Sequence, residues 1–131
     1  MLQPLLRVVV ADDHPDIVKA ICRSLMLDCD VVGRVADGRA LLEAVRQLQP
    51  DVVVVDVNLP QVHGLEACRR ITAAHPKTRV IMFTAMNDPD VRERSFEYGA
   101  SAFVCKTNID GLRAAIVRLA GELTSPPFQG S

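Results

Sequence analysis

The chain of 131 residues lacks a large excess of either charge, because 15 lysine and arginine residues stand against 16 aspartate and glutamate residues. This balance gives no electrostatic case for direct binding to nucleic acid or to a membrane surface. No apolar run approaches the roughly 20 residues of a membrane span. The first six residues also lack the charged start and long apolar centre of a signal peptide. We therefore expect a cytoplasmic protein with a single domain.

Paired cysteines are missing as well. The four cysteines form no C-x-x-C pair, and each lies in or beside an apolar stretch. They are Cys22, Cys29, Cys68 and Cys105. Reduced, buried thiols are the expected state, and a disulfide or a zinc site is the less favoured alternative. The three histidines are dispersed near turns and helix ends, so we predict neither a histidine metal ligand nor a catalytic histidine.

The most informative stretch is the apolar run Val52–Val55, which leads into Asp56. Four consecutive valines do not alternate with polar residues. The run therefore predicts a strand that is covered on both faces, as in the centre of a parallel sheet. Asn58 and Pro60 then end the strand and leave Asp56 at its carboxyl edge, where ligands bind in open α/β sheets.

Four other apolar runs predict the remaining strands, at Arg7–Ala11, Val31–Val35, Arg79–Thr84 and Ala102–Cys105. Apolar residues at helical spacing predict five helices between and after the strands, beginning near Pro15, Asp37, Leu65, Pro89 and Leu112. Strands that alternate with helices indicate the α/β class. We predict a flavodoxin-like, doubly wound (βα)5 three-layer sandwich with a parallel five-stranded sheet in the order 2-1-3-4-5.

Acidic residues follow two strands that are neighbours in this order. Asp12 and Asp13 follow the first strand, so they should meet Asp56 in one crevice, flanked by Thr84 and Lys106. Two carboxylates about 5 Å apart repel each other by roughly 3 kcal/mol at an effective dielectric constant near 20. A divalent cation relieves this repulsion. Because the ligands on offer are oxygens, the cluster favours Mg²⁺.

A hydroxyl and an ammonium group opposite such a cation suit a phosphoryl group. The nucleophile would then be a carboxylate, and the product an acyl phosphate. The backbone carbonyl of Asn58, just past Asp56, is a further candidate ligand for Mg²⁺. The residues alone thus predict a phosphoryl site at the carboxyl edge of the sheet.

The chain resembles the receiver domains of two-component response regulators, which are CheY-like. The motifs that carry the resemblance are Asp12-Asp13, Asp56 with Pro60 and Gly64 behind it, Thr84-Ala85, and Lys106 three residues after Phe103. The match runs from about Leu6 to Leu123. We therefore assign residues 1–123 to a receiver domain and residues 124–131 to a tail or a truncated linker to an output domain.

The resemblance implies that a sensor histidine kinase or a phosphotransfer protein phosphorylates Asp56. It implies that Mg²⁺ binds at Asp13 and Asp56, with Asp12 acting mostly through water. Such a domain is a phosphoacceptor rather than an enzyme, although it assists its own phosphorylation and dephosphorylation.

The resemblance also assigns the residues that respond to phosphorylation. It implies that Thr84, Lys106 and the backbone N–H of Ala85 contact the phosphoryl oxygens, and that Phe103 changes rotamer together with Thr84. The surface that responds would be the face made by the fourth helix, the fifth strand and the fifth helix. A homodimer is one use of that face.

The opening of the chain, Val8 to Pro15, looks like that of the NarL/LuxR-type subfamily, whose receivers usually precede a helix-turn-helix domain. This implies regulation of transcription through a DNA-binding domain outside this sequence. The sequence departs from many receivers at His63, before the glycine of the turn, and at Thr107, where proline is common after the lysine. The second departure leaves open whether the peptide after Lys106 is cis.

Other functions remain open at this point. One alternative is a stand-alone phosphorelay regulator with a single domain. A less favoured one is a Mg²⁺-dependent phosphatase with an aspartate nucleophile, which needs two acids spaced two apart after the first strand, whereas Asp12 and Asp13 are adjacent. A flavin or nucleotide binder would need a phosphate loop rich in Gly, Ser or Thr after that strand. A pure interaction module would lack part of the acid set.

Overall fold

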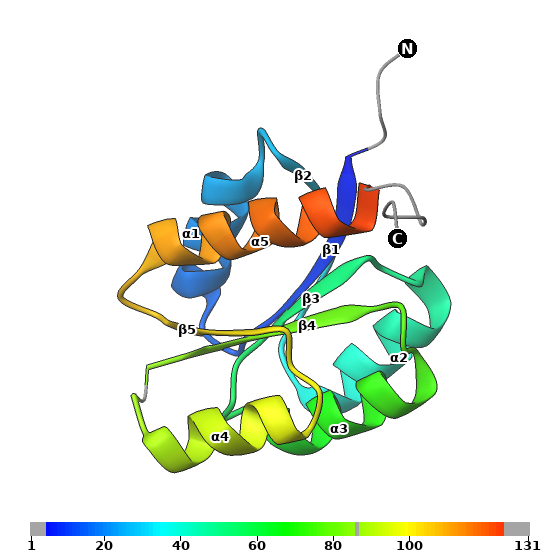
Figure 1. The fold of residues 1–131 in the computed structure, drawn as a ribbon, viewed down its shortest axis with the longest axis vertical. Coiled ribbons are helices and arrows are strands. Elements are labelled where there is room, and N and C mark those ends of the chain that lie inside the picture. Colours follow the sequence, from blue (N-terminus) through cyan, green and yellow to red (C-terminus); the bar gives the residue numbers. More distant parts are fainter. Residues whose placement is uncertain (1–4, 86, 125–131) are drawn as a thin grey trace, which may run out of the picture.

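The computed structural model describes residues 5–85 and 87–124, and in them five strands alternate with five helices (Figure 1). The strands are β1 (Leu6–Ala11), β2 (Cys29–Val35), β3 (Val52–Val55), β4 (Arg79–Thr84) and β5 (Ala102–Cys105). The helices are α1 (Pro15–Leu25), α2 (Gly38–Leu48), α3 (Gly64–Ala74), α4 (Pro89–Glu97) and α5 (Ile109–Thr124). The predicted alternation of strands and helices is confirmed.

The five strands form one parallel sheet in the order β2-β1-β3-β4-β5, which confirms the predicted flavodoxin-like topology. The central pair is β1 and β3, in which Ala11 lies opposite Val55. Each of these residues is the last of its strand. The residues that follow them, Asp12 and Asp56, are therefore delivered to the same edge of the sheet.

Helices cover both faces of the sheet, α1 and α5 on one side and α2, α3 and α4 on the other (Figure 1). The valine run divides between the two layers, because successive side chains of a strand point to opposite faces. Val52 and Val54 pack in the core with α1 and α5, and Val53 and Val55 in the core with α2 and α3. Each is at most 1 % exposed. Burying a valine contributes about 1.5 to 3 kcal/mol, so β3 is held firmly in place.

Two helices begin with an aspartate as the N-cap residue, α2 at Asp37, as predicted, and α4 at Asp88. The side chain of Asp37 accepts a hydrogen bond of 2.7 Å from the N–H of Ala40 at the start of α2. The side chain of Asp88 accepts one of 2.9 Å from the N–H of Asp90 at the start of α4. Gly99 follows α4 with a φ of 99°, a left-handed conformation that favours glycine. The two caps thus lie in the loops that follow β2 and β4, both at the carboxyl edge of the sheet.

The structure differs from the prediction at several boundaries. β2 begins at Cys29 rather than at Val31, because Cys29 is buried and pairs with Leu6 across the sheet. α5 runs through Thr124, the first residue of the predicted tail, and residues 125–131 lie outside the described part of the chain. The peptide after Lys106 is trans, since the described residues contain no cis peptide bond.

The four cysteines are free thiols, as expected. Three of them are buried, and burial raises the pKa of Cys29 to about 11 and that of Cys68 to about 12. Cys105 is half-buried, and a hydrogen bond with the hydroxyl of Thr107 lowers its pKa. Among the helices that the structure describes, none has the length and apolar character needed to cross a membrane.

Candidate functional site

Two buried carboxylates lie side by side at the carboxyl edge of the sheet. The N–H of Asp56 donates to the carbonyl of Ala11 at 2.9 Å, and the N–H of Asp12 donates to the carbonyl of Val35 at 3.1 Å. The backbone ladder thus continues one residue past β1 and β3. Asp12 and Asp56 are each only 3 % exposed. Their backbones are fixed by the sheet, so the carboxylates cannot move apart to relieve their repulsion.

Lys106 supplies the positive charge between these two carboxylates. Its Nζ lies 2.6 Å from Oδ2 of Asp12 and 3.2 Å from Oδ2 of Asp56, and its side chain is 10 % exposed. The N–H of Lys106 donates to the carbonyl of Thr84 at 2.7 Å, which holds the lysine at the end of β5. Burial acts to lower the pKa of Lys106, but its close contact with Asp12 and the charges of both carboxylates outweigh burial and raise it. The lysine is therefore a cation.

Asp13 and His14 form the solvent side of the cluster. Nδ1 of His14 lies 2.8 Å from Oδ1 of Asp12 and 3.1 Å from Oδ1 of Asp13. The hydrogen bond with Asp12 raises the pKa of His14, and the charges of both aspartates add to this effect. Sequence reasoning missed His14, which it treated as a residue of a helix end. The only available signal was its position directly after two acids.

The loop between β3 and α3 wraps closely around Asp56. The N–H of Asn58 donates to Oδ1 of Asp56 at 3.2 Å, and the N–H of Gly64 donates to the carbonyl of Val57 at 2.9 Å. A Cβ on Gly64 would lie 2.2 Å from the carbonyl oxygen of Asp56, so this position admits only glycine. The ring of His63 accepts a hydrogen bond of 3.3 Å from Leu65 and caps α3.

The predicted switch residues lie on β4 and β5. Thr84 is fully buried at the end of β4, and Ala85 follows it on the surface. Phe103 is half-buried on β5 and packs against the core on the α3 and α4 side. The guanidinium of Arg92, on α4, lies 5.9 Å from the centre of the Phe103 ring and 5.2 Å from that of Phe96. Arg92 thus covers the outer side of Phe103 through cation–π contacts.

The cluster has the charge and the donor atoms that a divalent cation requires. Three carboxylates and one ammonium leave a net charge of about −2 when His14 is neutral. The Oδ2 atoms of Asp12 and Asp56 are buried and accept no well-formed hydrogen bond within the described residues, so their contact with Lys106 is an ion pair. Asp12, Asp13, His14 and Asp56 each offer a ligand atom, all within 4.8 Å of one another. Oxygen-rich donors of this kind suit a hard divalent cation.

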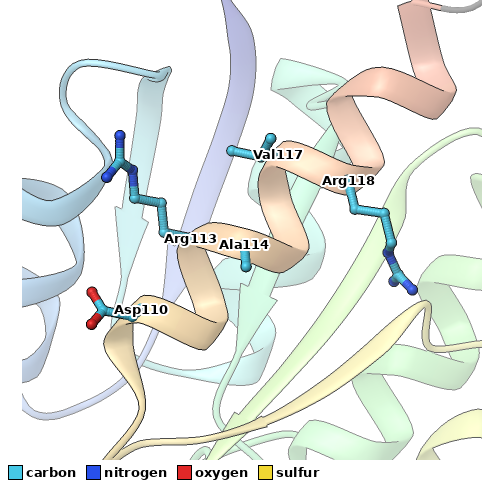
Figure 2. Close-up of a pocket in the computed structure, with 5 residues that line it drawn as sticks. All are labelled: Asp110, Arg113, Ala114, Val117 and Arg118. Carbon is cyan, nitrogen blue, oxygen red and sulfur yellow. The ribbon is translucent and has the colours of Figure 1, made fainter.

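A separate hollow lies on the outer face of α5 (Figure 2). It is lined by Asp110, Arg113, Ala114, Val117 and Arg118, all from one helix. Its lining contains none of the clustered carboxylates, and Arg113 and Arg118 are already paired, with the carboxylate of Asp28 at 2.7 Å and the carbonyl of Ser101 at 3.0 Å. The sheet edge is therefore the better candidate for a functional site than this hollow.

Comparisons with known proteins identify the family of this chain. Residues 8–117 match the family model described as the response regulator receiver domain. A response regulator GacA from Pseudomonas viridiflava is 35 % identical over 105 residues, which cover 78 % of this chain and 49 % of that protein. The transcriptional regulatory protein CutR from Streptomyces coelicolor is 37 % identical over 123 residues, which cover 94 % of this chain and 57 % of that protein. The chain thus spans about half the length of these curated relatives.

Solved structures give the same family. The signal receiver domain of NarL from Mycobacterium tuberculosis superposes with a TM-score of 0.82 at 30 % identity, covering 91 % of this chain and 99 % of that one. A two-component response regulator of the LuxR family from Aurantimonas sp. SI85-9A1 gives a TM-score of 0.83 at 32 % identity, covering 89 % of this chain and 86 % of that one. The chain therefore belongs to the family of response regulator receiver domains.

Proposed function

We propose that this receiver domain accepts a phosphoryl group on Asp56 with the help of Mg²⁺. The observation that carries the proposal is a carboxylate that is 3 % exposed and fixed at the sheet edge, with the ammonium of Lys106 at 3.2 Å and a second carboxylate beside it. A carboxylate held among fixed charges is suited to nucleophilic attack on phosphorus. The donor would be the phosphohistidine of a sensor histidine kinase or of a phosphotransfer protein.

The transfer balances as a single displacement. A carboxylate oxygen of Asp56 forms a bond to phosphorus while the bond from phosphorus to the histidine nitrogen of the donor breaks. The electron pair of that bond stays on the donor imidazole, which then takes up a proton. The product on this chain is an acyl phosphate. Lys106, which pairs with Asp56 before the reaction, would afterwards pair with a phosphoryl oxygen, so its ammonium never loses an anionic partner.

The residues that would hold Mg²⁺ are Asp13, Asp56 and the carbonyl of Asn58, with Asp12 acting mostly through water. Mg²⁺ keeps several waters and commonly uses one or two carboxylates plus a phosphate oxygen, which fits this set. When bound, the cation neutralises charge on the phosphoryl oxygens. The charge of the cluster, about −2 with neutral His14, matches one divalent cation.

The switch would act through the buried end of β4. Thr84 and the N–H of Ala85 would bind the phosphoryl oxygens, and Phe103 would move inward together with Thr84. Phe103 pairs with Met82 of β4, so a change at the end of β4 reaches it across one strand. The contact of Phe103 with Arg92 would then be lost, which changes the face made by α4, β5 and α5. A phosphoryl group can shift this equilibrium only through its different contacts in the two states.

This face would control an output, and a homodimer through it is one form of control. Regulation of transcription through a DNA-binding domain is the proposed output. The relative CutR is a transcriptional regulatory protein, which supports this proposal, as does the greater length of the curated relatives.

Labelling with a small phosphodonor tests the proposal. Purified protein incubated with acetyl phosphate and Mg²⁺ should gain the mass of one phosphoryl group, and the gain should disappear with EDTA or in the variant Asp56→Asn. A matched control is Asp51→Asn, because Asp51 lies at the opposite end of β3. Labelling that persists in Asp56→Asn, or release of phosphate without a labelled intermediate, would contradict the proposal. The second result would favour a phosphatase.

A further inference from the structure

The ring of His14 lies where a metal ligand would lie. Its Nδ1 is 2.8 Å from Oδ1 of Asp12 and 3.1 Å from Oδ1 of Asp13. Adjacent ligand atoms around an octahedral ion with bonds near 2.1 Å are about 3.0 Å apart. Nδ1 of His14 and Oδ1 of Asp13 therefore have the spacing of two neighbouring ligands of one cation, and the contact with Asp12 holds the ring in that position.

Two features of the local structure place the ring there. The N–H of His14 donates to Oδ1 of Asp12 at 2.9 Å, which turns residue 14 back toward the cluster. His14 is the N-cap residue of α1, yet its side chain makes no capping hydrogen bond, so the ring does not serve the helix. Lys106 contacts the other oxygen, Oδ2, of Asp12. The ammonium and the imidazole thus lie on different sides of the same carboxylate.

The imidazole side of the cluster is the side open to solvent. The side chains of His14 and Asp13 are 62 % and 40 % exposed, whereas those of Asp12 and Lys106 are 2 % and 10 % exposed. A cation that arrives from solvent meets Asp13 and His14 first. A neutral imidazole ligand adds no charge, so the balance between cluster and divalent cation is kept.

We infer that His14 supplies a nitrogen ligand to the cation of this site, which therefore binds later first-row transition ions such as Co²⁺ and Ni²⁺ more tightly than Mg²⁺. The inference rests on the proposed function, since it assigns a further ligand to the same site. Imidazole suits transition ions, whereas Mg²⁺ prefers oxygen donors. Removing the imidazole should therefore lower the affinity of the site for these transition ions, and lower its affinity for Mg²⁺ much less.

Calorimetric titration with each metal alone tests the selectivity. In His14→Ala and in His14→Asn, which places a favoured N-cap residue at this position, the affinity for Co²⁺ and Ni²⁺ should fall by about tenfold or more. The affinity for Mg²⁺ should change by less than about threefold, because an oxygen-preferring ion gains little from an imidazole. The matched control is His75→Ala, because His75 lies at the end of α3, which leads to the opposite edge of the sheet.

Electron spin-echo spectroscopy of bound Mn²⁺ tests ligation directly. Wild-type protein and His75→Ala should show the modulation of a coordinated imidazole nitrogen, and both His14 variants should lack it. If the modulation persists in the His14 variants, or if their affinities for Co²⁺ and Mg²⁺ fall equally, the inference is overturned while the proposed function stands. If the wild type binds no divalent cation, or if Asp13→Asn binds Mg²⁺ unchanged, the proposed metal site is wrong and the inference fails with it.

Discussion

Lys106 should contribute several kilocalories per mole to the free energy of unfolding when no metal is present. Its ammonium is the charge that balances Asp12 and Asp56, whose contacting oxygens are buried and accept no well-formed hydrogen bond within the described residues. Removing one partner of a buried ion pair costs about 3 to 5 kcal/mol, because an uncompensated charge remains. We take the lower end, since Asp13 leaves one side of the cluster open to water.

Lys106→Met should therefore lower the free energy of unfolding in EDTA by about 3 kcal/mol, and Tm by about 10 °C for a domain of this size. Saturating Mg²⁺ should recover more than half of this loss, because the cation replaces the missing charge. Removing one carboxylate as well, in Lys106→Met/Asp12→Asn, should also recover much of it, because only one buried charge then remains.

Denaturant titrations with and without Mg²⁺ measure these differences. The control is Lys77→Met, the same substitution at an exposed lysine, which should change stability by less than about 0.5 kcal/mol. The reasoning is refuted if Lys106→Met in EDTA is no less stable than Lys77→Met, or if Mg²⁺ stabilises both variants equally.

Three further predictions concern the surroundings of the site. Gly64→Ala should lower the free energy of unfolding by more than about 2 kcal/mol, because its Cβ would lie 2.2 Å from the Asp56 carbonyl oxygen. Gly121→Ala is the control: the new Cβ has open space around it and should stabilise α5 by about 0.5 to 1 kcal/mol. Urea titration measures both changes. Arg92→Ala should lower the free energy of unfolding by less than about 1 kcal/mol, yet it should shift the aromatic NMR signals of Phe103 toward those of the phosphorylated state. Unchanged signals would show that Arg92 does not hold the ring. Iodoacetamide at neutral pH should modify Cys105 before the other cysteines, because a hydrogen bond lowers its pKa while burial raises the pKa of the others; peptide mapping that finds another site modified first would contradict this.

The sheet and its acidic edge could be predicted from the sequence because their signals are local. The run Val52–Val55 has no polar alternation, and the structure buries it on both faces. The strand order then brings Asp12 beside Asp56, since β1 and β3 are neighbours. Lys106 could be placed by the same logic, because it directly follows a short apolar strand.

Features that depend on the direction of a side chain could not be predicted in this way. The ring of His14 meets Asp12 because the backbone turns at residue 14, and no spacing rule reports that turn. The contact of Arg92 with Phe103 joins α4 to β5, and it depends on rotamers of two long side chains. The early start of β2 depends on pairing with β1 rather than on its own pattern.

Chemical trapping of the acyl phosphate tests the central claim most directly. After reaction with acetyl phosphate and Mg²⁺, reduction with borohydride converts a phosphorylated aspartate to homoserine, which peptide mass spectrometry locates. The account predicts homoserine at Asp56 alone, and none when Mg²⁺ is withheld. Homoserine at Asp12 or Asp13, or a phosphoryl group on His14 with Asp56 intact, would contradict it.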